Sequence, residues 1–201
     1  MQWSELNIIN GSYKTVYNKF RLWSNLNIFK DAYKIILKKY VTLLNIDTIK
    51  YFATDTSFVK SIGGADCVGK NPTDRGRKAT KISILTENFG VPWSISFYEA
   101  NKNDCILIPE TLDELAHPII KNLCIFADKG YDSARCRQQL KDVGLEPIIA
   151  KRRTVSPKSY EKSRFIVENS FSWIKQYRRL RNRFEIKIKH FKSMVFFAVS
   201  N

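Results

Sequence analysis

A series of short apolar runs that begins near residue 46 limits the folds open to this chain more than any other feature. Residues 49–53 form one such run, residues 81–86 alternate apolar and polar side chains as a strand does, and residues 92–98 continue this pattern after a turn at 88–90. These segments predict a three-stranded antiparallel meander, in which the glycine- and charge-rich stretch 63–80 is a long loop between the first two strands.

A β-α-β unit and a final helix follow the meander. The expected elements are, in order, a helix at 106–116, a strand at 123–127, a helix at 133–143 closed by Gly144, a strand at 146–150, a basic loop at 151–159 and a long helix from about 160 to 184. This order of strands and helices is that of a ribonuclease-H-like α/β domain, in which helices flank a mixed sheet.

The first 45 residues have a different pattern. Apolar side chains such as Val16, Phe20 and Trp23 recur at helical intervals, and a polar break at 24–27 favours two short helices. Such a pair is compatible with a helix-turn-helix that reads DNA, and equally with a helical subdomain packed on the rest of the chain. We therefore expect a helical N-terminal region at 1–45 and an α/β domain at 46–201.

The composition favours a polyanionic partner. The net charge of +15, from 34 Lys and Arg against 19 Asp and Glu, exceeds what solubility requires, so nucleic acid is the first candidate. No apolar run approaches the ~20 residues that cross a bilayer, and the first five residues lack the blocks of a signal peptide. We expect a protein inside the cell and on DNA, in a bacterium the cytoplasm and nucleoid, with no membrane partner.

The four cysteines lack the spacing of a zinc site. Cys67, Cys105, Cys124 and Cys136 form no C-x-x-C pair, and the chain has only two histidines that could assist them. Free thiols are therefore expected in place of a structural metal or a disulfide.

Two aspartates stand directly after strand-like runs. Asp55 follows the first run of the meander and Asp128 follows the run 123–127, so neighbouring buried strands would bring both carboxylates to one edge of a sheet. Each aspartate taken singly also fits an ordinary turn residue, because Asp is common where strands stop. A third acid, Glu168, favours a shared site.

A helical wheel places Glu168 in a basic stripe of the predicted final helix. The members within about 40° of Glu168 are Arg164, Ser172, Lys175, Arg179 and Asn182. The opposite, apolar side consists of Ile166, Trp173, Tyr177, Leu180 and Phe184, and we expect it to dock on a sheet. A surface glutamate paired with Arg164 would explain Glu168 alone, but not two strand-end aspartates upstream.

Three carboxylates supply the hard oxygen ligands that Mg²⁺ or Mn²⁺ requires. A pair of such ions, ~3.5–4 Å apart, can activate an attacking oxygen and stabilise a leaving one, which is the chemistry of phosphodiester cleavage. We therefore expect the carboxylates of Asp55, Asp128 and Glu168 to reach one metal site. Like charges that share such a site should raise at least one carboxyl pKa when no metal is bound.

Positive charge is concentrated near the C-terminus. Residues 151–192 hold 14 Lys or Arg against three Glu, which is +11 of the total +15, and aromatic residues are interleaved among them. This pattern favours DNA, although a basic helix also suits RNA or an acidic protein. The candidate DNA contacts are Arg164, Lys175, Arg178, Arg179, Arg181 and Arg183.

Four stretches together resemble the DDE transposases of the bacterial insertion-sequence group related to the IS4 and IS5 elements, over nearly the whole chain. They are YKTVYNKFRLW, TDTSFVKS followed by DRGRKATKISILTENFGVP, IFADKGYDS, and RFIVENSFSWIKQYRRLRNRFE. The last is the most specific, because Arg164, Glu168 and Lys175 match the family's R-x3-E-x6-K spacing.

The resemblance implies a ribonuclease-H-like catalytic domain in which Asp55, Asp128 and Glu168 bind two Mg²⁺ or Mn²⁺ ions. It also implies that Arg164 and Lys175 contact DNA near the cut. The implied activity is cleavage of DNA at an element's terminal inverted repeats and strand transfer into target DNA, and we expect a homo-oligomer when the protein is active.

The chain departs from the family pattern in two places. The family has a tyrosine three positions before the arginine, where Glu161 stands here and Tyr160 lies one residue further away. Family members also carry several tens of residues more of helical DNA-binding sequence before the stretch that begins here at Met1, so we expect a chain shortened at its N-terminus.

Two alternatives to a transposing enzyme remain. One is a decayed or domesticated transposase that only binds DNA, which the presence of all three carboxylates disfavours. The other is a nuclease that cuts DNA without joining strands.

Overall fold

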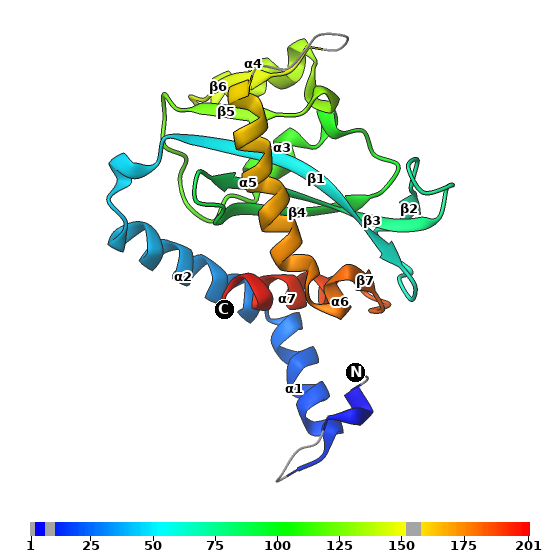
Figure 1. The fold of residues 1–201 in the computed structure, drawn as a ribbon. Helices are drawn as coiled ribbons and strands as arrows, with labels where there is room; N and C mark the ends of the chain where they lie inside the picture. The colour runs from blue at the N-terminus through cyan, green and yellow to red at the C-terminus, as the bar shows by residue number, and fades with distance from the viewer. Residues whose placement is uncertain (1–2, 7–10, 152–157) are drawn as a thin grey trace.

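A seven-stranded mixed sheet lies at the centre of the computed structural model (Figure 1), which describes residues 3–6, 11–151 and 158–201 but not the side chains of 158–163. Strand β3 (Lys78–Glu87) pairs antiparallel with β1 (Tyr51–Ser61) on one side and with β4 (Pro92–Glu99) on the other. The predicted meander is confirmed. The loop between β1 and β3 adds a short strand, β2 (Gly69–Lys70), on β3.

Parallel strands extend the sheet on the far side of β1. Strand β5 (Cys124–Ala127) pairs with β1, and β6 (Glu146–Ile149) pairs with β5. A two-residue strand, β7 (Asn182–Arg183), also pairs in parallel with the end of β1. The main path is β3-β1-β5-β6, with β4 outside β3, so the fold is the mixed α/β arrangement of a ribonuclease-H-like domain.

Helices cover both faces of this sheet. On one side, Ser83 of β3 hydrogen-bonds Thr111 of α3 (Ile108–Asp113), and α4 (Ala134–Asp142) packs against β6. On the other side lie α5 (Lys158–Lys175), which crosses in front of the sheet in Figure 1, and α7 (Ile188–Val199), whose Phe191 meets Phe97 of β4 edge to face. Alternating side chains of each strand therefore enter two different layers.

The N-terminal region forms two helices, α1 (Tyr13–Asn25) and α2 (Ile28–Leu43), as predicted. Asn27 allows the break because it adopts a left-handed conformation, with φ 58°. Tyr33 of α2 donates a hydrogen bond to the carbonyl of Pro92, and its ring lies in the same apolar core as the sheet. Short 3-10 turns, η1 (Trp3–Glu5) and η2 (Ile46–Thr48), flank this helical pair.

Two predictions for the last helix, its C-terminal end and the side that it buries, are wrong. Helix α5 ends at Lys175, and a separate turn of helix, α6 (Arg178–Arg181), follows. The side of α5 that packs on the sheet carries the buried Val167, Phe171 and Ile174. Trp173, expected on the docking side, is 39% exposed. Helix α7 was not predicted, and most of the predicted basic loop at 151–159 lies outside the described residues.

Two smaller expectations can be compared with the described residues. None of the four cysteines forms a disulfide with another in the structure. No helix in the described parts of the chain is long and apolar enough to cross a membrane.

Candidate active site

Asp55 on β1 and Asp128 directly after β5 lie side by side. The parallel pairing of β1 and β5 ends with Thr54 opposite Ala127, and the next residue of each segment is an aspartate. The sequence suggested that Asp55 ends its strand, and this is wrong. Strand β1 stays paired with β3 as far as Lys60, and Asp55 lies opposite Ile84 within it. It is the end of β5 that opens the sheet edge beside Asp55.

Helix α5 brings Arg164 and Glu168 to the same place. A small cleft is lined by Asp55, Asp128, Arg164 and Val167 together with residues of β1 and β5. The Nε of Arg164 donates to Oε1 of Glu168 at 2.8 Å, and its Nη1 lies 3.8 Å from Oδ1 of Asp128. Arg164 therefore links the glutamate on the helix to the aspartates on the sheet.

The three carboxylates do not converge on one point: Arg164 lies between Glu168 and Asp128, and Asp55 lines the same cleft as Arg164. Among the described residues, no three acidic, histidine or cysteine side chains lie close enough to hold a metal ion. The expected approach of all three to one metal position is therefore not seen. The Glu168 side chain is 53% exposed and pairs with Arg164 four residues earlier, as a surface glutamate would.

Burial raises the pKa of Asp55 to about 6, and the nearby charges of Asp128 and Asp104 act in the same direction. The backbone N–H of Thr56 and the Arg164 guanidinium oppose this rise only in part. The direction is the expected one, but burial is the larger cause of the raised Asp55 pKa and the charge of Asp128 a smaller one. Excess negative charge on adjacent hard oxygen donors is what a divalent cation relieves, so Asp55 and Asp128 fit such an ion.

The Arg164 guanidinium responds to the same cluster. Burial alone would lower its pKa, but the hydrogen bond to Glu168 and the charges of Asp128 and Asp55 raise it. In this arrangement Arg164 holds one carboxylate oxygen of Glu168, Oε1.

Lys175, the last residue of α5, contacts β1, the strand that carries Asp55. Its Nζ donates to the hydroxyl of Ser57, two positions after Asp55, and lies over the Phe171 ring. Burial lowers the pKa of Lys175. Arg164 and Lys175 therefore lie beside the part of β1 that carries Asp55 and Ser57, and Glu168 is held by Arg164.

Residues 52–199 match the family described as Transposase DDE domain. The chain belongs to this family. The match covers Asp55, Asp128, Glu168 and every helix and strand from β3 to α7, so the family resemblance found in the sequence is confirmed.

Two relatives illustrate the membership of this DDE chain. It is 40% identical over 129 residues, 61% of its own length and 61% of the relative, to a Burkholderia cepacia protein assigned as the transposase for insertion sequence element IS402. It is 31% identical over 101 residues, 45% of its length and 34% of the relative, to the transposase for insertion sequence element IS1106 from Neisseria meningitidis serogroup B. The DDE chain thus spans 61% and 34% of these relatives in the matched regions.

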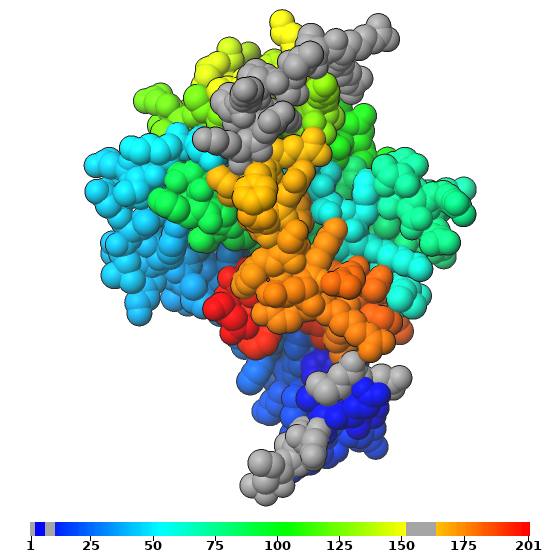
Figure 2. Space-filling view, viewed as in Figure 1, coloured from blue at the N-terminus to red at the C-terminus, as the bar shows by residue number. Residues whose placement is uncertain are grey.

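The other candidate DNA contacts of the DDE domain differ in exposure. Helices α5 and α6 lie on the surface of one face of the molecule (Figure 2), and Arg178 and Arg181 of α6 are exposed. Arg179 is partly engaged, because it forms an ion pair with the buried Glu185 and lies over the Trp3 ring. Arg178 and Arg181 are therefore better placed than Arg179 to meet a phosphate.

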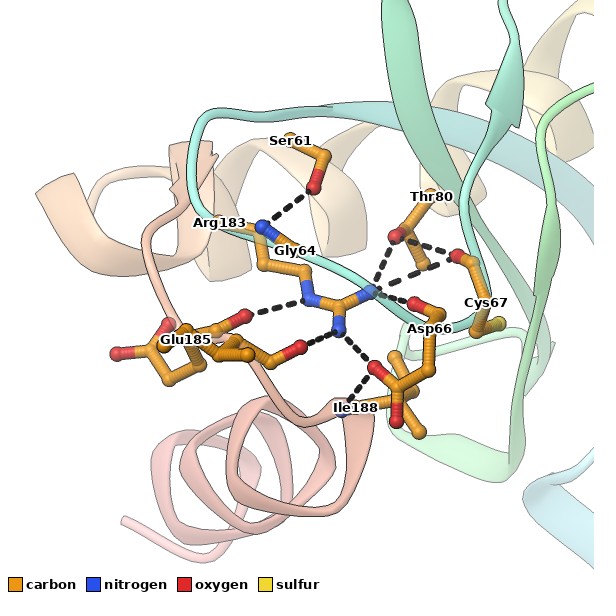
Figure 3. Close-up of polar contacts among 9 residues, drawn as sticks. Ser61, Gly64, Asp66, Cys67, Thr80, Arg183, Glu185 and Ile188 are labelled. Carbon is orange, nitrogen blue, oxygen red and sulfur yellow. Dashed lines mark hydrogen bonds and ion pairs between the residues drawn. The ribbon is translucent and has the colours of Figure 1, made fainter.

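Arg183 is a correction to the predicted DNA contacts, because its side chain is 0% exposed. Figure 3 shows the guanidinium enclosed by polar groups of the β1–β2 loop and the segment before α7. It donates to the carbonyl oxygens of Asp66, Glu185 and Ile186, to the Thr80 hydroxyl and to the Asp66 carboxylate. All of its donors serve the fold, so it cannot contact DNA from this position.

One acid near the site escaped the sequence analysis. Asp104 opens the 3-10 turn η3 (Asp104–Ile106), accepts a hydrogen bond from Thr56, and acts on the pKa of Asp55. Its only signal in the sequence is its place shortly after the third strand of the meander, a position like those of the two other aspartates. Charge and spacing alone gave no reason to select it.

Proposed function

We propose that this DDE domain catalyses metal-dependent cleavage of DNA at the ends of an insertion sequence, followed by strand transfer into target DNA. The observation that carries the proposal is that Asp55 and Asp128 line one cleft at the end of β5 together with Arg164, which forms ion pairs with Asp128 and Glu168. Membership of the transposase DDE domain family supports it.

Asp55, Asp128 and Glu168 would hold Mg²⁺ or Mn²⁺, proposed as two ions, which would activate an attacking oxygen and stabilise the leaving one. The sheet fixes the two aspartates, whereas the more exposed Glu168 can change partners on the surface of α5. Once Glu168 and Asp128 no longer hold Arg164, its guanidinium can bind a phosphate through two parallel hydrogen bonds. Arg164 would thus orient the DNA strand at the cut.

The DNA would run along α5 and α6. Lys175 lies beside Ser57 near the acids, and the exposed Arg178 and Arg181 continue the basic surface away from them. We divide the chain into an N-terminal helical region, 1–45, and a catalytic domain, 46–201. We also propose that it works as a homo-oligomer, on DNA inside the cell.

The test uses DNA that carries the inverted repeats flanking the gene, a target plasmid, and Mg²⁺ or Mn²⁺. The proposal predicts metal-dependent nicks that leave 3′-OH ends, and strands joined to the plasmid. Asp128→Asn should abolish both products while DNA binding persists, and the exposed Asp142→Asn serves as the matched control. Binding without cleavage would identify a DNA-binding protein, and nicks without joined strands would identify a nuclease.

A further inference from the structure

A polar cluster lies on the opposite face of the sheet from Asp55. It consists of Thr56 on β1, Lys81 on β3 and Asp104 at the start of η3. Because side chains alternate along a strand, Thr56 points away from the α5 side, to which Asp55 belongs. The cluster therefore contacts β1, the strand that carries Asp55, on the face of the sheet opposite to α5.

Lys81 holds Asp104 in place. The Lys81 side chain is 4% exposed, and its Nζ donates to Oδ1 of Asp104 at 2.8 Å and to the carbonyl of Lys102. An ion pair removed from water in this way contributes little net stability, but breaking it leaves an uncompensated charge. Asp104 is consequently fixed in position by a buried lysine.

Asp104 in turn contacts both segments that carry the candidate metal ligands. Its Oδ1 accepts a hydrogen bond from the Thr56 hydroxyl at 2.9 Å, one residue after Asp55. Its Oδ2 lies so close to Gly130 that a Cβ there would stand 2.8 Å away. Gly130 belongs to the turn η4 (Lys129–Tyr131), which begins directly after Asp128. A single carboxylate thus touches the strand beside Asp55 and the turn beside Asp128.

We propose that Asp104 is a positioning residue that sets the separation of Asp55 and Asp128 by tying β1, through Thr56, to the turn η4. This inference rests on the proposed function, because it concerns how the metal-binding aspartates are held. Asp104 is not itself a metal ligand, since its Oδ1 is occupied by Lys81 and Thr56 and its Oδ2 faces the η4 backbone. The groups that orient metal ligands typically affect metal affinity about 10–100-fold.

The test measures Mn²⁺ affinity of the 201-residue chain by the electron paramagnetic resonance signal of free Mn²⁺. Thr56→Val removes the hydroxyl but keeps a β-branched strand residue, and Asp104→Asn keeps the shape but removes the charge. Both should raise the Mn²⁺ Kd about tenfold. Thr56→Ser keeps the hydroxyl and should restore an affinity near that of the wild type.

The matched controls are Thr42→Val, whose hydroxyl bonds a carbonyl within α2, and Asp74→Asn, whose carboxylate faces Arg77 in an exposed turn. Neither should change the Kd, and circular dichroism melting checks that Thr56→Val is folded. Wild-type affinity in Thr56→Val overturns the inference, as does an equal loss in Thr56→Ser. A wild-type chain that binds no Mn²⁺ overturns the proposed function as well.

Discussion

Arg164 and Arg183 belong to the same basic segment of the chain, but their surroundings differ in kind. The Arg164 side chain is 48% exposed, and its partners are two carboxylates, Asp128 at the sheet edge and Glu168 on α5. Arg183 is 0% exposed and donates mainly to carbonyl oxygens of its own fold. Arg164 can exchange its partners for a ligand, whereas Arg183 is buried and three of its partners are backbone carbonyls.

This difference teaches what a run of positive charge can and cannot indicate. The excess of Lys and Arg in 151–192 favours an anionic partner for the whole segment. It does not say which guanidinium groups face that partner. An arginine side chain has five N–H donors and can also hydrogen-bond several buried carbonyl oxygens at once. Exposure and the chemical type of the acceptors separate the two roles.

The largest effect is expected for Arg183→Met, which should lower the free energy of unfolding by about 3–5 kcal/mol. The substitution removes every hydrogen bond that the guanidinium makes in the β1–β2 loop and before α7. Urea unfolding measures the loss. Arg181→Met, on the exposed turn next to it, should stay within about 0.5 kcal/mol. A loss below about 1 kcal/mol for Arg183→Met would remove the distinction between the two arginines.

The next effect concerns pH. Because the pKa of Asp55 is about 6 in the folded state, above its ordinary value of 3.8, the folded protein binds the proton more tightly than the unfolded chain does. Its contribution to the free energy of unfolding therefore falls as pH rises from about 4 to 6, by up to about 3 kcal/mol, and stays low above that range.

Asp55→Asn removes this titration, so the variant should be more stable than the wild type at pH 7.5 and equally stable below pH of about 4. Urea unfolding at both pH values measures the difference, and Mg²⁺ should stabilise only the wild type at pH 7.5. A difference between the two proteins that is the same at both pH values would exclude Asp55 as the group responsible.

For Glu168, the partner of Arg164, Glu168→Gln should slow DNA cleavage and leave the free energy of unfolding nearly unchanged. Removal of a metal ligand should slow DNA cleavage by more than the ~10–100-fold typical of groups that only orient a ligand. The lost pair with Arg164 should cost at most about 0.5 kcal/mol of stability, because both side chains are about half exposed. Nicking, DNA binding and urea unfolding are measured on one preparation. Near-normal nicking would make Glu168 an ordinary surface residue.

The smallest effect is expected in the salt dependence of DNA binding. Each of Arg178→Ala and Arg181→Ala should reduce the slope of log K against log salt by about 1, because one phosphate contact is lost. A folded Arg183→Lys variant should keep the wild-type slope. Fluorescence anisotropy titrations at several salt concentrations give these slopes. Equal slopes for all variants would place the DNA away from α6.

The order of strands and helices could be predicted because it depends on local patterns. The alternation in residues 81–86 and the apolar run before Asp128 reflect burial in a sheet, and both became strands. The end of α5 could not be predicted, since neither Gly nor Pro marks residues 176–177 and the apolar Tyr177 continues a helical pattern. The predicted apolar side of this helix included residues beyond Lys175, so the prediction of which side packs on the sheet was wrong too.

The candidate site was predictable in part for a similar reason. Two aspartates after apolar runs follow from strand geometry, and parallel pairing of β1 with β5 set them side by side. The contact of Asp104 with Thr56 joins residues far apart in the chain, and the burial of Arg183 depends on Gly64, where a Cβ would lie 2.9 Å from its Cζ. Such contacts exist only once the sheet has formed.

The most direct test of the metal assignment is a crystal structure of the chain with Mn²⁺, in which anomalous scattering locates the metal. The assignment predicts Mn²⁺ between Asp55 and Asp128, with a Glu168 carboxylate oxygen bound to it and Arg164 released from Glu168. Mn²⁺ held by the two aspartates while Glu168 remains paired with Arg164, or Mn²⁺ bound at a different place, would contradict it.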